Sequence, residues 1–179
     1  MLGIEVERNR GAHTISFSQQ AYIRKILEHF GLQDAYLLST LLDPHHKLSL
    51  AQCPDNPCQY RSMRDVPYRE AIGSLMYVAL GTRPDIMFAV TFLSQFMQNL
   101  GHSHWEEVKQ VFRYLKGTIH WKLTIGMGGH WDWAEPEKWD CIGLEGFADV
   151  DGVSQYHRHS ISGYIFTIDG GAVSWSSKK

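Results

Sequence analysis

The stretch LEGFADVDG, residues 144–152, places two aspartates two positions apart in a run of residues typical of a β-strand. Side chains alternate between the two faces of a strand, so Asp149 and Asp151 are expected on the same face as Phe147. Two carboxylates on one face suit a hard divalent cation such as magnesium, but hydrolysis by paired metal ions needs further acids from other elements. The alternative is two exposed acids beside a turn.

A row of basic residues runs through the stretch HSHWEEVKQVFRYLKG, residues 102–117. Lys109, Arg113 and Lys116 have spacings that put them along one side of a helix, with the apolar residues on another side. A cationic stripe of this kind could contact nucleic-acid phosphates, and the alternative is an ordinary solvated surface. The chain has a formal charge of -2, so its total charge offers no support for a nucleic-acid partner.

Histidines and cysteines gather in the stretch HHKLSLAQCPDNPC, residues 45–58, which could be imagined as a zinc site. The spacing argues against zinc, because ligand pairs in structural sites usually stand closer together and this cysteine pair straddles two prolines. We expect His102 and His104 to serve the N-terminus of the helix that follows them rather than a metal. The four imagined ligands are His45, His46, Cys53 and Cys58.

The composition is that of a core-forming globular protein, since 44% of the 179 residues are hydrophobic. Three cysteines, an odd number, argue against a disulfide framework, so we expect an intracellular protein of the cytoplasm or nucleus. No run approaches the roughly 20 apolar residues of a membrane span, so we expect no membrane partner. Motifs of serine hydrolases, P-loop NTPases and dinucleotide-binding dehydrogenases do not occur in the sequence, which leaves those classes without support.

The elements that must position these groups begin with a β-hairpin. Apolar and polar residues alternate over residues 2–7 and 14–17, on either side of a turn that contains a glycine. A helix is predicted over about residues 19–30, because apolar residues recur at helical spacing between a possible N-cap at Ser18 and a C-terminal Gly31.

A linker and three helices are expected next. From residue 37 to 64 the periodicity fades and prolines accumulate, which predicts an extended linker. Asp65 is a possible cap for the first of the three helices. The second begins at Thr82 and is apolar around most of its circumference, which indicates burial on several sides. The third opens with Ser103 and Glu106 in capping-box spacing.

The last third of the chain changes to strand-like segments, which favours a β-rich unit. The predicted fold class is therefore α+β: an N-terminal β-hairpin, a three-helix bundle and an antiparallel sheet. The strand-like segments cover residues 121–126, 141–152, 162–170 and 172–179. The corresponding divisions of the chain are 1–17, 18–118 and 119–179.

Three long stretches together resemble one family. PYREAIGSLMYVALGTRPDIMFAVTFLSQFMQNLGHSHWEEVKQVFRYLKGT, residues 67–118, closely resembles the C-terminal portion of copia-type retrotransposon reverse transcriptase. LGIEVERNRGAHTISFSQQAYIRKILEHFG, residues 2–31, is similar to the segment that precedes it there. GFADVDG and HSISGYIFTIDGGAVSWSSKK, within residues 146–179, are similar to the first strands of the ribonuclease H domain that follows.

The resemblance implies a fold and a set of site residues. The hairpin would be the end of the polymerase palm, the helices a thumb and connection that grip a duplex, and the C-terminal strands the start of a ribonuclease H-like sheet. Asp149 matches the first magnesium ligand of ribonuclease H in this family, and Asp151 matches a second, weaker candidate. Lys109, Arg113 and Lys116 would track the phosphates of an RNA:DNA hybrid or primer–template duplex.

The resemblance also implies that catalytic parts are missing. The paired aspartates of the family's polymerase precede the LGIE strand, and further ribonuclease H carboxylates follow the SWSSKK segment. We therefore expect a remnant that is catalytically inactive by itself and binds no magnesium productively. Five departures from the family pattern suggest a decayed copy: Leu41, Leu100, Gly152, His159 and Ile161.

Two alternatives stay open. The chain could be a non-catalytic module that binds nucleic-acid duplexes through its thumb helices. It could instead be a non-functional translation product that aggregates, because an incomplete sheet exposes strand edges and apolar surface and so favours self-association.

Overall fold

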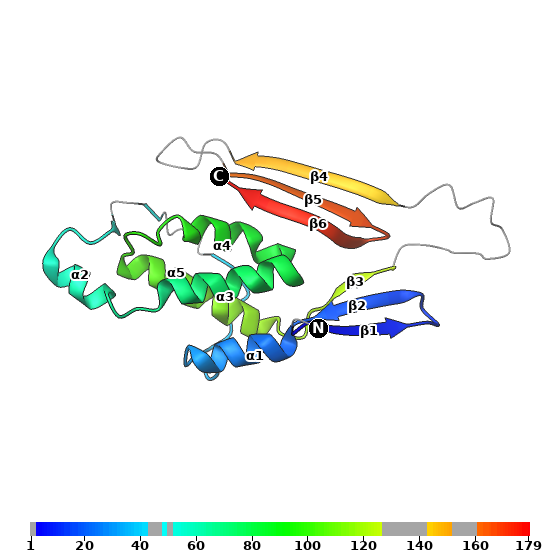
Figure 1. Ribbon diagram of the computed structural model, residues 1–179, viewed down its shortest axis with the longest axis horizontal. Coiled ribbons are helices and arrows are strands. Elements are labelled where there is room, and N and C mark those ends of the chain that lie inside the picture. The colour runs from blue at the N-terminus through cyan, green and yellow to red at the C-terminus, as the bar shows by residue number, and fades with distance from the viewer. Residues whose placement is uncertain (1–2, 43–47, 50–51, 127–142, 152–160) are drawn as a thin grey trace.

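The chain folds as a mixture of helices and two three-stranded antiparallel sheets, so the predicted α+β class is confirmed (Figure 1). The computed structural model describes residues 3–42, 48–49, 52–126, 143–151 and 161–179. Within these ranges, no helix is long and apolar enough to cross a membrane.

The first sheet contains the predicted hairpin. Strands β1 (Glu5–Asn9) and β2 (Thr14–Ser18) pair antiparallel, and the left-handed residue of the turn is His13, with a φ of 53°. Strand β3 (Leu123–Ile125) pairs with β2 on its other side. The segment 121–126 was predicted to belong to the C-terminal β-rich unit, and this placement was wrong. Its strand β3 completes the N-terminal sheet by pairing with β2, although it follows all the helices in sequence.

Helix α1 (Gln20–His29) follows β2 directly. The expected cap at Ser18 lies one residue early: Gln19 occupies the N-cap position, and the Ser18 hydroxyl accepts a hydrogen bond from the Gln20 amide, at 3.2 Å. The helix ends before Gly31, which has a φ of 67°, as the sequence predicted.

The expected extended linker contains a helix that the sequence analysis missed. Helix α2 (Pro57–Met63) begins with Asn56, whose side chain accepts a hydrogen bond from the Gln59 amide at 2.9 Å, followed by proline at the first helical position. The prediction of an extended stretch was wrong here, because α2 has only 7 residues and shows no repeating apolar face. The Asn-Pro start was the available signal.

The next two helices are divided by a short 3-10 turn. Helix α3 (Tyr68–Gly81) begins without any side-chain cap, so the cap predicted at Asp65 was wrong. The turn η2 (Pro84–Ile86) then leads into helix α4 (Met87–Ser94), in place of one helix from Thr82. The prediction that this segment is buried on several sides holds, since Met87, Ala89, Val90 and Leu93 are all buried.

Helix α5 (His102–Gly117) is capped by a histidine rather than by the predicted pair of Ser103 and Glu106. The Gly101 amide donates to Nδ1 of His104 at 2.9 Å, and the imidazole stacks on the ring of Phe96. Glu106 instead forms an ion pair with Lys109. The expectation that His104 serves the helix N-terminus is therefore confirmed.

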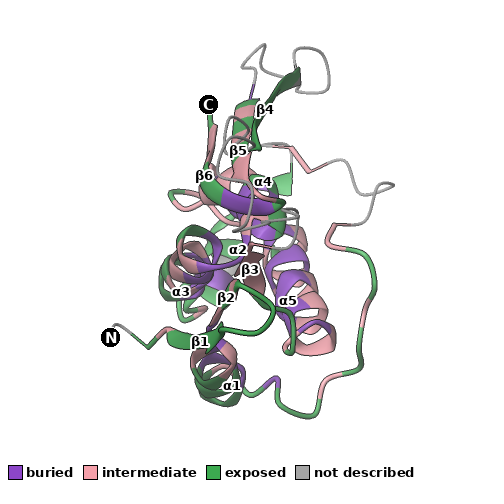
Figure 2. Ribbon diagram, turned by 90° about the vertical axis from the view of Figure 1, so that its right-hand side faces the viewer, coloured by how far each residue is buried: buried purple, intermediate pink, exposed green. Residues whose placement is uncertain are grey.

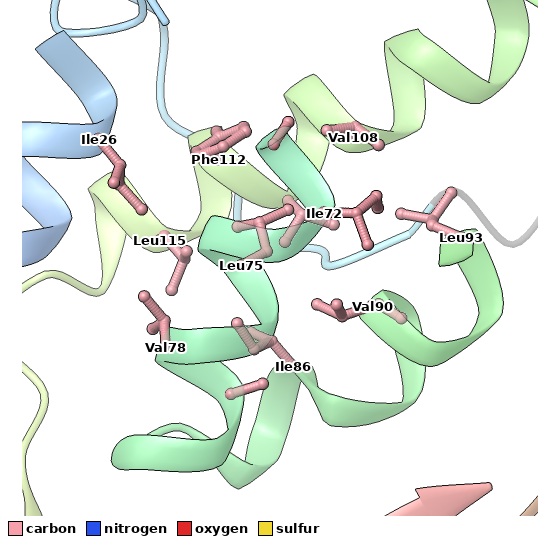
Figure 3. Packing of buried hydrophobic residues seen from close by; sticks show 14 of the residues in the cluster. Ile26, Ile72, Leu75, Val78, Ile86, Val90, Leu93, Val108, Phe112 and Leu115 are labelled. Atoms are coloured by element: carbon pink, nitrogen blue, oxygen red, sulfur yellow. The ribbon is translucent and has the colours of Figure 1, made fainter. Parts of the chain in front are cut away.

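Helices α1, α3, α4 and α5, together with η2, form what we call the helical unit, and its core is continuous (Figure 3). Leu75 of α3, Val90 of α4 and Phe112 of α5 have no exposed surface and pack into one cluster. Buried residues accordingly concentrate on α3, α4 and α5 in Figure 2, whereas β1 and residues 144–150 of β4 are exposed.

The second sheet is a meander of β4 (Leu144–Asp151), β5 (Ile161–Ile168) and β6 (Gly171–Lys178). The turn between β5 and β6 consists of Asp169 and Gly170, both with positive φ (47° and 77°). This is the two-residue geometry that matches the twist of paired strands.

The second sheet is attached to the rest of the molecule through one face and one edge. The indole Nε1 of Trp175 donates to the Ala79 carbonyl at 2.9 Å, and the Thr91 hydroxyl donates to the Ser177 carbonyl at 3.2 Å. Strand β6 also lies beside β3 of the first sheet, so closely that any side chain at Gly171 would collide with the Thr124 carbonyl (Figure 1).

Candidate functional site

Asp149 lies near the end of β4 on an exposed stretch of strand. Its Oδ1 accepts a hydrogen bond from the Val150 amide at 2.8 Å. The residue opposite on β5 is Gly163, which has no side chain to cover the carboxylate. The carboxylate is therefore open to solvent and to an approaching ligand.

Asp149 faces a concavity of about 500 Å³ between the second sheet and the junction of η2 with α4. Phe147 lies on the sheet side beside it, and Asp85 and Phe88 line the opposite wall. Among the described residues that line this concavity there is no lysine, arginine or histidine. The surroundings of Asp149 are thus apolar and acidic.

Asp85 is already held by the protein. Both of its carboxylate oxygens accept hydrogen bonds from Arg83, at 2.8 and 2.7 Å, and one also accepts from the Tyr114 hydroxyl at 3.0 Å. Burial, and then the negative charge of Asp85, raise the pKa of Tyr114. These contacts make Asp85 a structural carboxylate rather than a free metal ligand.

Arg83 joins the ends of three elements, a role that the sequence analysis missed. Its side chain is only 3% exposed, and it donates to the carbonyl and the hydroxyl of Thr118 at the end of α5. The guanidinium also lies 5.2 Å from the ring centroid of Trp121. An arginine that is directly followed by proline and aspartate at a helix junction was the only local signal.

The described donors do not by themselves fit a magnesium ion. Magnesium sites combine several oxygen ligands in octahedral geometry. Asp151 is the last residue of β4, and its side chain lies outside what the structure describes. In the described ranges, no three or more histidine, cysteine, aspartate or glutamate side chains converge as a metal-binding group.

The predicted basic stripe of Lys109, Arg113 and Lys116 lies on α5 and is engaged within the chain. Lys109 Nζ is 2.5 Å from Oε1 of Glu106, and Lys116 Nζ donates to the Ala35 carbonyl at 2.6 Å. The guanidinium of Arg113 lies 4.4 Å from the ring centroid of Tyr36. Arg113 and Lys116 therefore hold the segment after α1 against α5. These contacts leave less of the positive charge of the stripe available for an outside partner.

The imagined zinc site falls largely outside the described residues, which include neither His45 and His46 nor the side chain of Cys58. Cys53 is buried, and its thiol donates to the Asn99 carbonyl at 2.9 Å. Burial, with a smaller effect of Asp55, raises the pKa of this thiol. Cys53 is thus a protonated, inert packing residue.

The chain is similar to polyproteins of plant transposons along almost its whole length. It is 41% identical over 179 residues to the retrovirus-related Pol polyprotein from transposon TNT 1-94 of Nicotiana tabacum, and 33% identical over 182 residues to that from transposon RE1 of Arabidopsis thaliana. Each match covers 99% of this chain but only 13% and 11% of the relatives. The chain thus spans about an eighth of the length of these polyproteins.

A shorter relative is also similar. The secreted RxLR effector protein 161 of Plasmopara viticola is 39% identical over 118 residues, which cover 65% of this chain and 75% of that protein. No family model matches the chain. No solved structure matches it either. The collinear similarity to several transposon polyproteins nevertheless decides the family: the chain belongs to the retrovirus-related Pol polyproteins of copia-type transposons.

Proposed function

We propose that the chain is the part of a copia-type Pol polyprotein in which the reverse transcriptase ends and ribonuclease H begins. On this proposal the hairpin is the last piece of the palm, the helical unit is the thumb and connection, and the second sheet holds the first ribonuclease H strands. The similarity to Pol polyproteins along 99% of the chain is the observation that carries it. The order of hairpin, helices and meander is the order that the proposal requires.

We further propose that the chain is catalytically silent by itself. Hydrolysis of a phosphodiester by paired magnesium ions needs several carboxylates that converge on the metals. Asp149 supplies one open carboxylate, while Asp85, across the concavity, is occupied by Arg83 and Tyr114. In this proposal Asp149 is one ligand of a centre whose other ligands come from elsewhere in a working polyprotein.

The test is to incubate the purified chain with magnesium and either a labelled RNA:DNA hybrid or a primed template. We expect no cleavage and no primer extension above the blank. Glu145→Ala is the matched control for Asp149→Ala, because Glu145 is an exposed carboxylate on the same strand. Magnesium-dependent cleavage that Asp149→Ala abolishes and Glu145→Ala preserves would overturn the proposed silence.

A second candidate function is the holding of a nucleic-acid duplex by α5. The observation that favours it is the alignment of three cations along one partly exposed helix face. Side chains of this kind hold duplexes through phosphate charge and backbone shape, without base recognition. Lys109 is the most informative member, because its ion-pair partner lies on the same helix, whereas Lys116 and Arg113 also hold the segment after α1.

Filter binding of an RNA:DNA hybrid across a salt series tests this second function. Lys109→Ala is expected to weaken binding and to lower the salt dependence by about one released counterion. Lys122→Ala is the matched control, because Lys122 also pairs with a glutamate, Glu7, but lies outside α5. Equal losses for the two variants would exclude a specific role for the stripe.

A further inference from the structure

A second concavity, of about 670 Å³, lies at the end of the helical unit that adjoins α2. It lies among α2, the connection to α3, the first turn of α3 and the segment 97–100. Its floor is apolar: Met63 and Tyr68 are buried there, and Val66 and Leu100 are half-buried. We call this concavity the arginine pocket, for the residues on its rim.

Three exposed arginines line the arginine pocket: Arg61, Arg64 and Arg69. Glu70 is the one acidic residue among the described residues that line it, and its carboxylate lies 2.8 Å from Nε2 of His29. Asp65 is a neighbour in sequence but not a lining residue. The pocket therefore has an excess of positive charge, in a chain whose total charge is -2.

The arginines of the pocket differ from the basic stripe in what they contact. Arg69 donates through Nε to the Met97 carbonyl at 3.3 Å, which ties its side chain to the opposite wall. Arg61 and Arg64 form no salt bridge with any residue that the structure describes. Their guanidinium groups remain available for an anion from outside, whereas the stripe is occupied by the chain's own groups.

An aromatic ring stands beside these cations. Tyr60 of α2 lines the pocket and is 52% exposed, so its ring is accessible from solvent. Guanidinium groups bind phosphates with paired hydrogen bonds, and flat bases stack on aromatic rings. An apolar floor, a cationic rim and an exposed ring together match a nucleotide.

We propose that the arginine pocket binds a nucleotide unit of a single-stranded nucleic acid, with a phosphate on the arginines and a base against Tyr60. The choice of nucleic acid as the polyanion rests on the proposed function. The site itself is separate from the duplex-holding face suggested for α5, because it lies on other elements. A single strand bound here would therefore lie outside the duplex-holding face of α5.

Fluorescence anisotropy of a labelled 12-nucleotide single strand and of an RNA:DNA hybrid, over a salt series with the full chain, tests the proposal. The pocket variant replaces the three arginines of the rim together: Arg61→Ala, Arg64→Ala and Arg69→Ala. The matched control removes the same charge from three exposed arginines elsewhere: Arg8→Ala, Arg10→Ala and Arg24→Ala. Circular dichroism melts of both variants verify the fold.

The pocket variant is expected to bind the single strand about tenfold more weakly or worse, with a salt slope reduced by about 2, and the control variant is expected to bind like the original chain. Tyr60→Leu should weaken binding about fivefold or more, and Tyr60→Phe should restore it. If the pocket variant does not fold, two other sets of variants test the proposal. The first is the pair Tyr60→Leu and Tyr60→Phe. The second replaces the same three arginines with lysine, which keeps the positive charge but loses the paired hydrogen bonds.

Equal losses in the pocket and control variants, or no loss in either, would overturn the proposal. Complete displacement of the strand by inorganic phosphate at equal phosphate concentration would also overturn it, because the pocket would then be a free-anion site. The hybrid arm separates this proposal from the second candidate function. Single-strand binding that is weakened by Lys109→Ala but not by the pocket variant refutes the pocket. Hybrid binding that does not respond to Lys109→Ala refutes the duplex function and leaves the pocket standing.

Discussion

The helical unit and the second sheet differ in how they use their apolar side chains. In the helical unit, apolar residues from four helices face one another, and Leu75, Val90 and Phe112 are fully buried (Figure 3). In the second sheet, one face packs on α3 and α4 through Trp175 and the neighbouring residues. The other face leaves Val150 62% exposed and Tyr164 43% exposed.

This difference indicates where the folding free energy comes from. Burial of apolar surface is the main favourable contribution, and the helical unit has a core of fully buried apolar residues, whereas the second sheet buries one face. The second sheet gains from one face, from strand pairing and from two side-chain hydrogen bonds to the helical unit. We therefore expect the helices to set the stability and the sheet to follow them.

The largest expected effect is from removing a core side chain of the helical unit. Leu75→Ala should lower the free energy of unfolding by about 2–5 kcal/mol, since it leaves a cavity in a closed core. Leu80→Ala is the matched control, because Leu80 lies on the same helix and is 60% exposed, and should change it by no more than about 0.5 kcal/mol. Urea denaturation measures both, and similar losses would contradict the contrast drawn between enclosed and open surfaces.

A smaller effect is expected where the second sheet is attached. Trp175→Phe removes the donor to the Ala79 carbonyl and should cost about 1–2 kcal/mol, because a partly buried acceptor loses its partner. If the sheet depends on this attachment, the Trp175→Phe variant should show a larger increase in hydrogen exchange on β5 and β6 than on α3. Trp121→Phe, at an exposed tryptophan outside the sheet, is the control. Unchanged protection of the sheet would show that the attachment lies elsewhere.

His104 should make the helical unit sensitive to acid. Burial lowers the pKa of His104 below its ordinary value of 6.5, and the backbone at Ser49 offsets part of this effect. The unfolded chain then binds the proton more tightly, so the contribution of His104 is complete above about pH 6.5 and is lost as the pH falls toward the lower folded-state pKa. Each unit of pKa difference between the two states corresponds to about 1.4 kcal/mol.

His104→Gln is the variant for this prediction, since glutamine keeps a hydrogen-bond acceptor but does not titrate. Melting temperatures between pH 5 and pH 8 should fall more steeply with acid for the original chain than for the variant. His102→Gln is the control, because His102 is exposed on the same helix. If the melting temperatures of all three proteins depend on pH in the same way, His104 is not the cause of the acid sensitivity.

The smallest effect on stability, and the clearest effect on association, is expected on the open face of the second sheet. Tyr164→Thr together with Phe166→Thr should change the unfolding free energy by no more than about 1 kcal/mol, because both side chains lie on the open face, each 43% exposed, and threonine suits a strand. Sedimentation should show less self-association in this variant than in the original chain. Leu37→Thr, at an exposed leucine outside the sheet, should leave association unchanged.

Much of the fold followed from local sequence patterns. Alternation predicted the hairpin, helical spacing predicted α1, α3 and α5, and Gly31 ended α1 as expected. Three of the four strand-like segments predicted for the C-terminal unit form the second sheet, and the fourth pairs with the hairpin. Local patterns failed where an element was short or where a cap was unusual. The Asn56-Pro57 start of α2 and the imidazole cap of α5 depend on a few residues with no repeating pattern around them.

The sequence by itself determined the family and the fold class, because these depend on residue order and on patterns within single elements. Only the tertiary structure decided which charges are free, because that depends on neighbours that are distant in sequence. Lys116 meets Ala35, and Arg83 meets Thr118, only after the chain has folded. The same folding brings Arg69 to Met97 and leaves Arg61 and Arg64 on the rim of a pocket, which no spacing along the chain had indicated.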